Sequence, residues 1–168
     1  LRQKLAGRCP TVPEALELTE DRSGAIFSFA CRAGGRLARA DRRVISSLGR
    51  YGRHIGMAWQ IAEDLATISG MSSEQLEDLA ANDRPNLVVC LGAEIDPGIA
   101  SDWTALTRDP DPGRAERLIE RVLASGAVER GRERMHWEAW SARKTLQTGL
   151  EPSPHREVLD HIAGTLLT

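Results

Sequence analysis

The chain of 168 residues has almost no lysine, few cysteines and no long apolar run, and these absences exclude several classes of protein. No stretch approaches the roughly 18 apolar residues of a membrane helix, and no signal-peptide pattern opens the chain. The 22 basic and 24 acidic residues nearly cancel, so no global field favours nucleic acid. Cys9, Cys31 and Cys90 fit neither a disulfide framework nor a zinc site. We expect a cytoplasmic protein that binds no nucleic acid and does not insert stably into a membrane.

The sequence also lacks β-hairpin signals, internal repeats, a glycine-rich phosphate loop and histidines at metal-binding spacing. Residues 87–94 resemble a strand by residue type, but no second strand candidate exists, so a helix is favoured there. We therefore expect an all-α protein. Asp41 is expected to cap one long helix, and Gly70 to end it in a left-handed conformation. The expected helical segments are residues 1–9, 14–40, 42–68, 74–79, 87–94, a short helix near Trp103, 114–125, 127–147 and 155–167.

Two consecutive helices of this set carry regular stripes. Gly49, Gly52 and Gly56 stand three and four residues apart, so they share one face of the 42–68 helix and allow another helix to come close. On the preceding helix, apolar residues recur at helical spacing: Ile26, Phe29, Ala30, Ala33 and Leu37.

A polar stripe follows the glycines on the 42–68 helix and consists of Gln60, Glu63, Asp64 and Thr67. The two carboxylates could bind Mg²⁺, with water and phosphate oxygens completing the octahedron, which is how a protein presents this metal to a diphosphate. The alternative is a solvated helix end with Gln60 as an ordinary polar residue. Spacing alone favours the alternative, because acid pairs on helices are common.

Two arginines also have both a functional and an ordinary interpretation. The guanidinium of Arg22 could bind a phosphate through its fork of donors, or it could form a surface ion pair with Glu20 or Asp21 worth under about 1 kcal/mol. Arg84 is either a phosphate ligand or a loop charge. Each arginine taken alone favours the ordinary interpretation.

Taken in order, these pieces resemble the trans-isoprenyl diphosphate synthase family, the polyprenyl synthetases. The family pattern YG..LG.AFQI.DD.LD..G is similar to YGRHIGMAWQIAEDLATISG at residues 51–70. RSGAIFSFACRAGG, at residues 22–35, stands where the family has Lys-Thr or Lys-Ser followed by Gly or Ala. DRPNLVVCLGAE, at residues 83–94, resembles the family's G-K-x-T-L-P element, with Arg84 for the lysine and Asn86 for the threonine. The C-terminal segment resembles the family's last two helices.

The resemblance implies an isoprenoid (terpenoid) synthase helical bundle and a Mg²⁺-dependent prenyltransferase that uses an allylic prenyl diphosphate. It implies that Glu63, with Asp64, holds metal, and that Arg22 and Arg84 bind diphosphate. Gln60 and Ser23 would offer oxygens near the carbocation. The helix that often lines the hydrocarbon tunnel carries Phe27, Ala30 and Cys31.

The chain departs from the family in ways that bear on function. Thr67 stands where the family's second aspartate-rich motif has its third acid. The family's first aspartate-rich motif has no counterpart in this sequence. The chain also starts with Leu1 rather than methionine. The resemblance therefore implies that residues 1–168 are the C-terminal part of one domain, whose N-terminal half is absent or supplied by another chain. It also implies a homodimer or a heteromer with a related chain. Two alternatives stay open: transfer to a non-isoprenoid acceptor, and a non-catalytic regulatory subunit of a heteromeric synthase.

Overall fold

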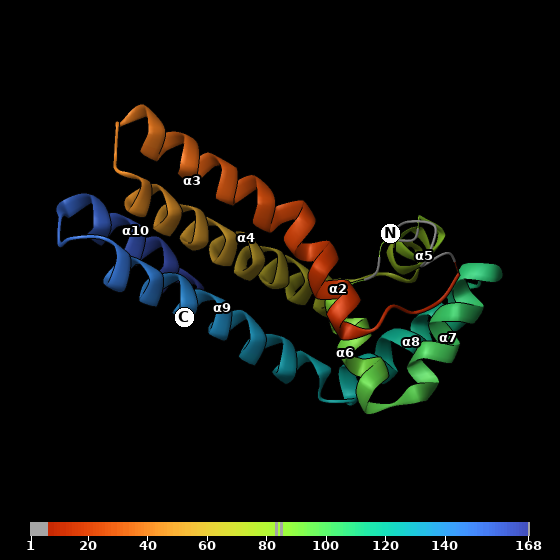
Figure 1. The fold of residues 1–168 in the computed structure, drawn as a ribbon. Coiled ribbons are helices and arrows are strands. Elements are labelled where there is room, and N and C mark those ends of the chain that lie inside the picture. Colours follow the sequence, from red (N-terminus) through yellow and green to blue (C-terminus); the bar gives the residue numbers. More distant parts are fainter. Residues whose placement is uncertain (1–6, 83, 85, 168) are drawn as a thin grey trace. The chain divides into compact units, whose positions relative to one another are not determined.

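The computed structural model of the chain describes residues 7–82, 84 and 86–167, and every regular element among them is helical (Figure 1). This confirms the expected all-α class. The predicted helix at residues 1–9 lies mostly outside the described residues. The elements are α2 (Val12–Thr19), the π-helical turn η1 (Glu20–Gly24), α3 (Ala25–Leu37), α4 (Arg42–Gly70), α5 (Ser73–Ala81), α6 (Leu87–Ile95), α7 (Pro97–Arg108), α8 (Pro112–Ala124), α9 (Ala127–Gly149), α10 (Pro154–Gly164) and the short 3₁₀ turn η2 (Thr165–Leu167).

Side chains at the helix starts explain where many of the helices begin. The Asp41 carboxylate accepts a hydrogen bond from the Val44 amide at 2.8 Å, which confirms Asp41 as the cap of α4. Ser72 and Gln75 form a capping box at the start of α5. Three helices share another device, a capping Asp or Ser followed by a proline that has no amide to lose in the first turn: α7, α8 and α10.

The boundaries differ from expectation at two places. The helix expected over residues 14–40 is divided by η1 into α2 and α3. Gly70 is the last residue of α4, but among the described residues the positive φ values belong to Gly7, Arg39 and Gly126. The left-handed conformation predicted for Gly70 was therefore wrong, because the chain passes from α4 into the extended cap of α5. Gly126, with φ of 85°, separates α8 from α9, where the sequence predicted a break.

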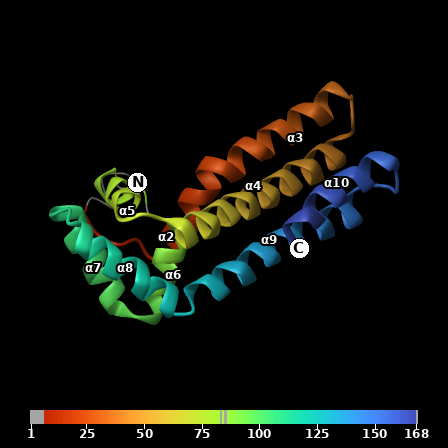
Figure 2. The same ribbon diagram turned by 180° about the vertical axis from the view of Figure 1, so that it is seen from behind.

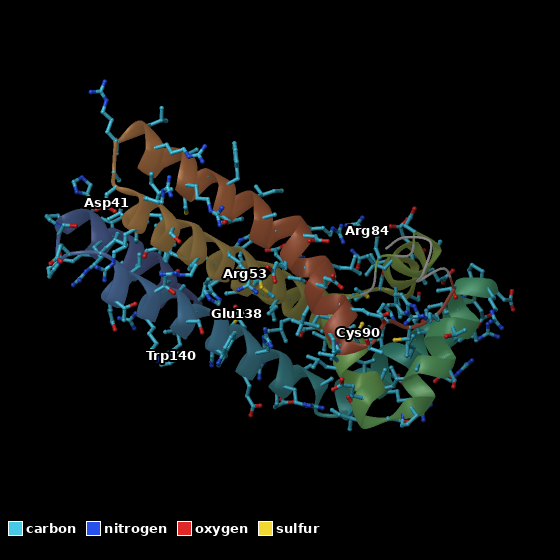
Figure 3. The ribbon with its side chains drawn as sticks, viewed as in Figure 1. Asp41, Arg53, Arg84, Cys90, Glu138 and Trp140 are labelled. Atoms are coloured by element: carbon cyan, nitrogen blue, oxygen red, sulfur yellow. The ribbon has the colours of Figure 1, made fainter. Side chains whose placement is uncertain are left out.

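The chain forms two compact units, and α2, α4 and α9 each contribute to both. The first unit comprises residues 1–16 and 63–132. Its helices α5, α6, α7 and α8 contact one another around a fully buried apolar core that includes Leu76, Leu87, Ile99, Trp103, Leu106 and Leu118. The thiol of the buried Cys90 (Figure 3) shares a hydrogen bond with Cys9, which lowers the pKa of Cys9, and all three cysteines are free.

The second unit comprises residues 17–62 and 133–168. Within it α3 runs beside α4, as both Figure 1 and Figure 2 show. A core cluster of Tyr51, Ile55, Ala142, Leu146 and Ala163 joins α4 to α9 and α10. The Tyr51 hydroxyl donates to the Leu159 carbonyl at 2.8 Å, and burial raises the pKa of this phenol well above its ordinary value.

Among the described residues, no helix combines the length and the apolar composition that crossing a bilayer requires.

Candidate functional site

Ser23 and Gln60 are hydrogen-bonded although 37 residues separate them in the chain. Ser23 lies in the π-helical turn η1, and its hydroxyl donates to Gln60 Oε1 on α4 at 2.8 Å. The Ser23 residue is only 9% exposed and Gln60 is half-buried, so this bond is partly buried. π-helical turns are rare and occur frequently at functional sites. The second unit therefore brings together the two residues for which the resemblance implies oxygens near the cation.

The glycine stripe of α4 allows this contact. A Cβ atom at Gly56 would lie 2.5 Å from the Ser23 carbonyl oxygen, and one at Gly52 would lie 2.4 Å from the Phe27 carbonyl oxygen. Real Cβ atoms do not approach backbone so closely, so any side chain at either position would push α4 away from η1 and α3. The predicted close approach of a second helix at this stripe is confirmed.

The three residues predicted to line a hydrocarbon tunnel do not share one environment. Phe27 is half-buried, and its ring lies 6.1 Å from that of Trp59 on α4. Cys31 is half-buried against Gly52, and burial raises the pKa of its thiol. Ala30 is exposed. Phe27 and Cys31 therefore belong to the α4-facing side of α3, and Ala30 does not.

The neighbouring acids Glu63 and Asp64, in the first unit, have different surroundings. Asp64 Oδ2 accepts a hydrogen bond from the Leu87 amide at 2.8 Å, and the Asp64 carbonyl accepts one from the Asn86 side chain at 2.9 Å. Asn86 in turn caps α6 through the Val88 amide. The Glu63 side chain is exposed and has no partner among the described residues. Asp64 thus holds the start of α6 against α4, whereas the exposed Glu63 side chain takes no part in that contact.

Thr67 and the two arginines complete the predicted set. The Thr67 hydroxyl donates to the Glu63 backbone carbonyl at 2.6 Å, so it is engaged within its own helix. Arg22 belongs to the second unit and Arg84 to the first. Both are exposed, and neither forms an ion pair with another described residue. The ion pair considered for Arg22 with Glu20 is not formed. Glu20 instead pairs with Arg53, whose guanidinium donates to each of the two Glu20 carboxylate oxygens at 2.6 Å.

A buried ionic cluster in the second unit was missed by sequence reasoning. Glu138 on α9 is only 1% exposed, accepts a hydrogen bond from Arg134 at 2.6 Å, and has an oxygen 2.7 Å from His54 Nδ1 on α4. Figure 3 shows Glu138 and Arg53 on facing helices. The available signal was the stripe of α9 on which Glu138 lies, since Gly131, Ala142 and Leu146 on the same stripe are buried. An acid on an apolar stripe requires a partner.

Known proteins are similar to this chain in sequence and fold, although no protein-family model matches it. Geranylfarnesyl diphosphate synthase of Natronomonas pharaonis is 27% identical over 161 residues, which are 94% of this chain and 46% of that protein. Geranylgeranyl diphosphate synthase of Mycobacterium tuberculosis is 33% identical over 127 residues, 70% of this chain and 36% of that protein. The solved geranylgeranyl pyrophosphate synthetase of the archaeon Geoglobus acetivorans matches with a TM-score of 0.71 at 28% identity, over 94% of this chain and 48% of that one.

These similarities support the resemblance of the chain to the trans-isoprenyl diphosphate synthase family. The chain spans about half the length, or less, of these synthases. The predicted isoprenoid synthase fold is confirmed by the match to the solved synthetase. The roles of single residues stay predictions. Within the described part of the chain, Ser23, Gln60, Asp64 and Thr67 have hydrogen-bond partners, whereas Glu63, Arg22 and Arg84 have no side-chain partner there.

Whether the chain suits Mg²⁺ depends on Glu63 and Asp64. Within the described part of the chain, no group of three or more His, Cys, Asp or Glu side chains could hold an ion. A closed metal cage is therefore not present there. Mg²⁺ commonly binds through one or two carboxylates together with water and substrate phosphates. The exposed Glu63 carboxylate, with the partly engaged Asp64 beside it, fits that shared mode.

Proposed function

We propose that the chain is the C-terminal part of an isoprenoid synthase domain that transfers a prenyl group from an allylic prenyl diphosphate, with Mg²⁺, in isoprenoid biosynthesis. The hydrogen bond between Ser23 and Gln60 carries this proposal, because it joins two motifs that the family resemblance assigns to one chemistry. The related proteins named as prenyl diphosphate synthases support it. The free cysteines suit the cytoplasm as its compartment.

In the first unit, Glu63 and Asp64 would hold Mg²⁺, which supplies neutralising charge to the departing diphosphate. Arg84 adds a guanidinium whose planar donors match phosphate oxygens. Arg84 is exposed and forms no ion pair with another described residue.

In the second unit, Ser23 and Gln60 would orient oxygen dipoles toward positive charge on the allylic carbon. The Ser23 hydroxyl donates to Gln60 Oε1, and this fixes the orientation of both groups before any substrate binds. Phe27 and Trp59 contribute an apolar surface beside this pair that would exclude water from a reactive cation. Arg22 would bind diphosphate oxygens.

A non-catalytic subunit of a heteromeric synthase is the second candidate. Two observations favour it: Thr67 is bonded within its own helix where the family has its third acid, and Asp64 already holds the start of α6. Only Glu63 then remains as a free carboxylate of the motif. A third reading, transfer to a non-isoprenoid acceptor, would retain the Ser23 and Gln60 pair and need fewer metal ligands.

Release of inorganic diphosphate from an allylic prenyl diphosphate tests the proposal. The assembled protein is expected to release diphosphate in the presence of Mg²⁺ and an acceptor, and to stop when the metal is chelated. The subunit candidate predicts no release until an active synthase partner is added. Absence of Mg²⁺-dependent release with every acceptor and partner tried would contradict the proposed activity.

A further inference from the structure

Two of the three cysteines, Cys9 and Cys90, form a pair of neighbouring thiols within the first unit. Their side chains share a hydrogen bond, although positions 9 and 90 are far apart in the sequence. Cys90 lies on α6 and is only 1% exposed, whereas Cys9 is half-buried. The proposed prenyl transfer uses neither thiol, and two sulfurs placed in this way are what a disulfide bond requires.

Contacts on both sides of Cys9 hold its segment in place. Before it, the Gly7 carbonyl accepts a hydrogen bond from the Thr107 hydroxyl of α7 at 3.4 Å. Beside it, Arg8 donates to the two carboxylate oxygens of Glu14 at 2.8 and 2.5 Å, and to the Cys9 carbonyl at 3.3 Å. The Cys9 sulfur is therefore held next to its partner thiol, and a short approach of the two sulfurs, to about 2 Å, is enough to bond them.

Cys9 also lines a surface pocket of about 460 Å³ in the first unit. Two arginines, Arg8 and Arg108, line the same pocket together with the hydroxyl residues Ser101 and Thr104. A small reagent can therefore reach Cys9 from solvent. The guanidinium groups place positive charge around the pocket, and such surroundings favour the thiolate, which is the nucleophilic form of cysteine.

The cysteines differ in how readily they ionise. The pKa of the Cys9 thiol is lowered by its hydrogen bond with Cys90 and by the charge of Arg8, although burial opposes the shift. The pKa of Cys31, in the second unit, is raised by burial. Because a lower pKa increases the thiolate fraction, Cys9 is expected to react first and Cys31 serves as an internal reference.

We propose that Cys9 and Cys90 are a redox modification site, at which hydrogen peroxide converts the two thiols to a disulfide. The Cys9 thiolate attacks one peroxide oxygen, so the S–O bond forms, the O–O bond breaks, and the other oxygen leaves as hydroxide and takes up the proton that Cys9 lost. The Cys90 sulfur then attacks the Cys9 sulfur, so the S–S bond forms and the hydroxyl group leaves as water with the Cys90 proton.

The two thiols thereby lose two electrons, and the peroxide becomes two molecules of water. Two molecules of a low-molecular-weight thiol return the electrons and become a disulfide themselves. In the oxidised state the bond fastens the segment of Cys9 to α6, so the unfolded chain is restricted by a long closed loop and the folded state is stabilised.

Titration of free thiols after brief treatment of the chain with hydrogen peroxide tests the site. The number of free thiols per chain is expected to fall from three to one and to return to three with dithiothreitol, and peptide mapping should find Cys9 linked to Cys90. The melting temperature of the oxidised chain should be higher than that of the reduced chain. Cys9→Ser should abolish the loss of thiols, whereas the matched control Cys31→Ser should still form the disulfide.

Cys90→Ala separates the two steps, since Cys9 should then stop at the sulfenic acid, which dimedone traps. Three outcomes in the folded wild-type chain would overturn the proposal: all three thiols survive, Cys9 is oxidised without linking to Cys90, or Cys31 is the residue that becomes linked. An equal loss of thiols in wild type and Cys9→Ser would do the same. The assay contains no prenyl diphosphate and no Mg²⁺, so its result is independent of the proposed prenyl transfer.

Discussion

Helices α3 and α6 are both rich in apolar residues, yet they differ in how much of that surface is covered. Residues 87–92 of α6 are all buried, and the neighbouring α7 and α8 contact this helix within the first unit. On α3 the buried residue is Gly35, whereas Ile26, Phe29 and Leu37 remain exposed. Similar compositions therefore form a covered core on α6 and leave exposed apolar side chains on α3.

The difference lies in what each helix packs against. The start of α6 is fixed by Asp64 and Asn86, and the helix is then enclosed by elements of its own unit. α3 approaches α4 at the glycines of α4 and leaves Ile26, Phe29 and Leu37 exposed. Large apolar residues on a covered face stabilise the fold directly, but on an uncovered face they contribute only when a partner arrives.

The largest expected difference in stability is between truncating a side chain on α6 and truncating one on α3. Leu87→Ala, at 1% exposure on α6, should lower the free energy of unfolding by about 2–5 kcal/mol through lost burial and a cavity. Phe29→Ala on α3 should change it by less than about 0.5 kcal/mol in the chain alone. Urea unfolding followed by circular dichroism measures both. Equal losses of unfolding free energy in the two variants would show that Phe29 is buried within the chain itself.

The contact between α3 and α4 is probed by comparing Gly52 on α4, which lies in that contact, with Gly34 on α3, which does not. Gly52→Ala should destabilise the chain by about 1–3 kcal/mol, because the added Cβ meets the Phe27 carbonyl oxygen and the Cys31 sulfur. Gly34→Ala should stabilise it by up to about 1 kcal/mol through helix propensity, since nothing lies within 4 Å of a Cβ there. Thermal unfolding of the two variants distinguishes them by the sign of the shift.

A smaller effect is expected from the ion pair between Glu20 and Arg53. The Arg53 guanidinium, through its hydrogen bonds, lowers the pKa of the Glu20 carboxyl from its ordinary value of 4.5. The pair therefore stabilises the folded state above that value, and the contribution is lost as the pH falls through the lower pKa of the folded state. Both side chains are 42% exposed, so the pair contributes under about 1 kcal/mol.

Arg53→Met tests this pair through the pH dependence of stability. The melting temperature of wild type should fall more steeply than that of the variant as the pH drops below 4.5, and the two curves should run closer together in acid. Parallel curves over the whole range would mean that the pair contributes nothing to folding.

Local sequence signals predicted the helices well, because caps and breaks are encoded within a few residues. Asp41 caps α4, and Gly126 separates α8 from α9 as expected. The apolar recurrence of Ile26, Phe29 and Leu37 correctly predicted a helix. It did not reveal which face is covered, since periodicity is the same for a buried and an exposed stripe.

Long-range contacts were harder to predict. Asp64 and Leu87 are 23 residues apart, so nothing in the local pattern indicated that this carboxylate holds the start of α6. Glu138 and His54 are 84 residues apart. The family resemblance assigned Ser23 and Gln60 to the surroundings of one cation, but the hydrogen bond between them was not predicted, because no spacing rule relates a residue in η1 to one on α4.

Glu63 is proposed to serve diphosphate chemistry alone, whereas its neighbour Asp64 also holds the start of α6. The most direct test is the rate of Mg²⁺-dependent diphosphate release by the assembled protein carrying Glu63→Ala. We predict a fall of about tenfold or more, with an unchanged unfolding midpoint, because the exposed carboxylate contacts no other described side chain. Asp64→Asn is the control and should lower the midpoint, since Asp64 Oδ2 accepts the Leu87 amide. A Glu63→Ala rate equal to that of wild type with every acceptor would contradict the account.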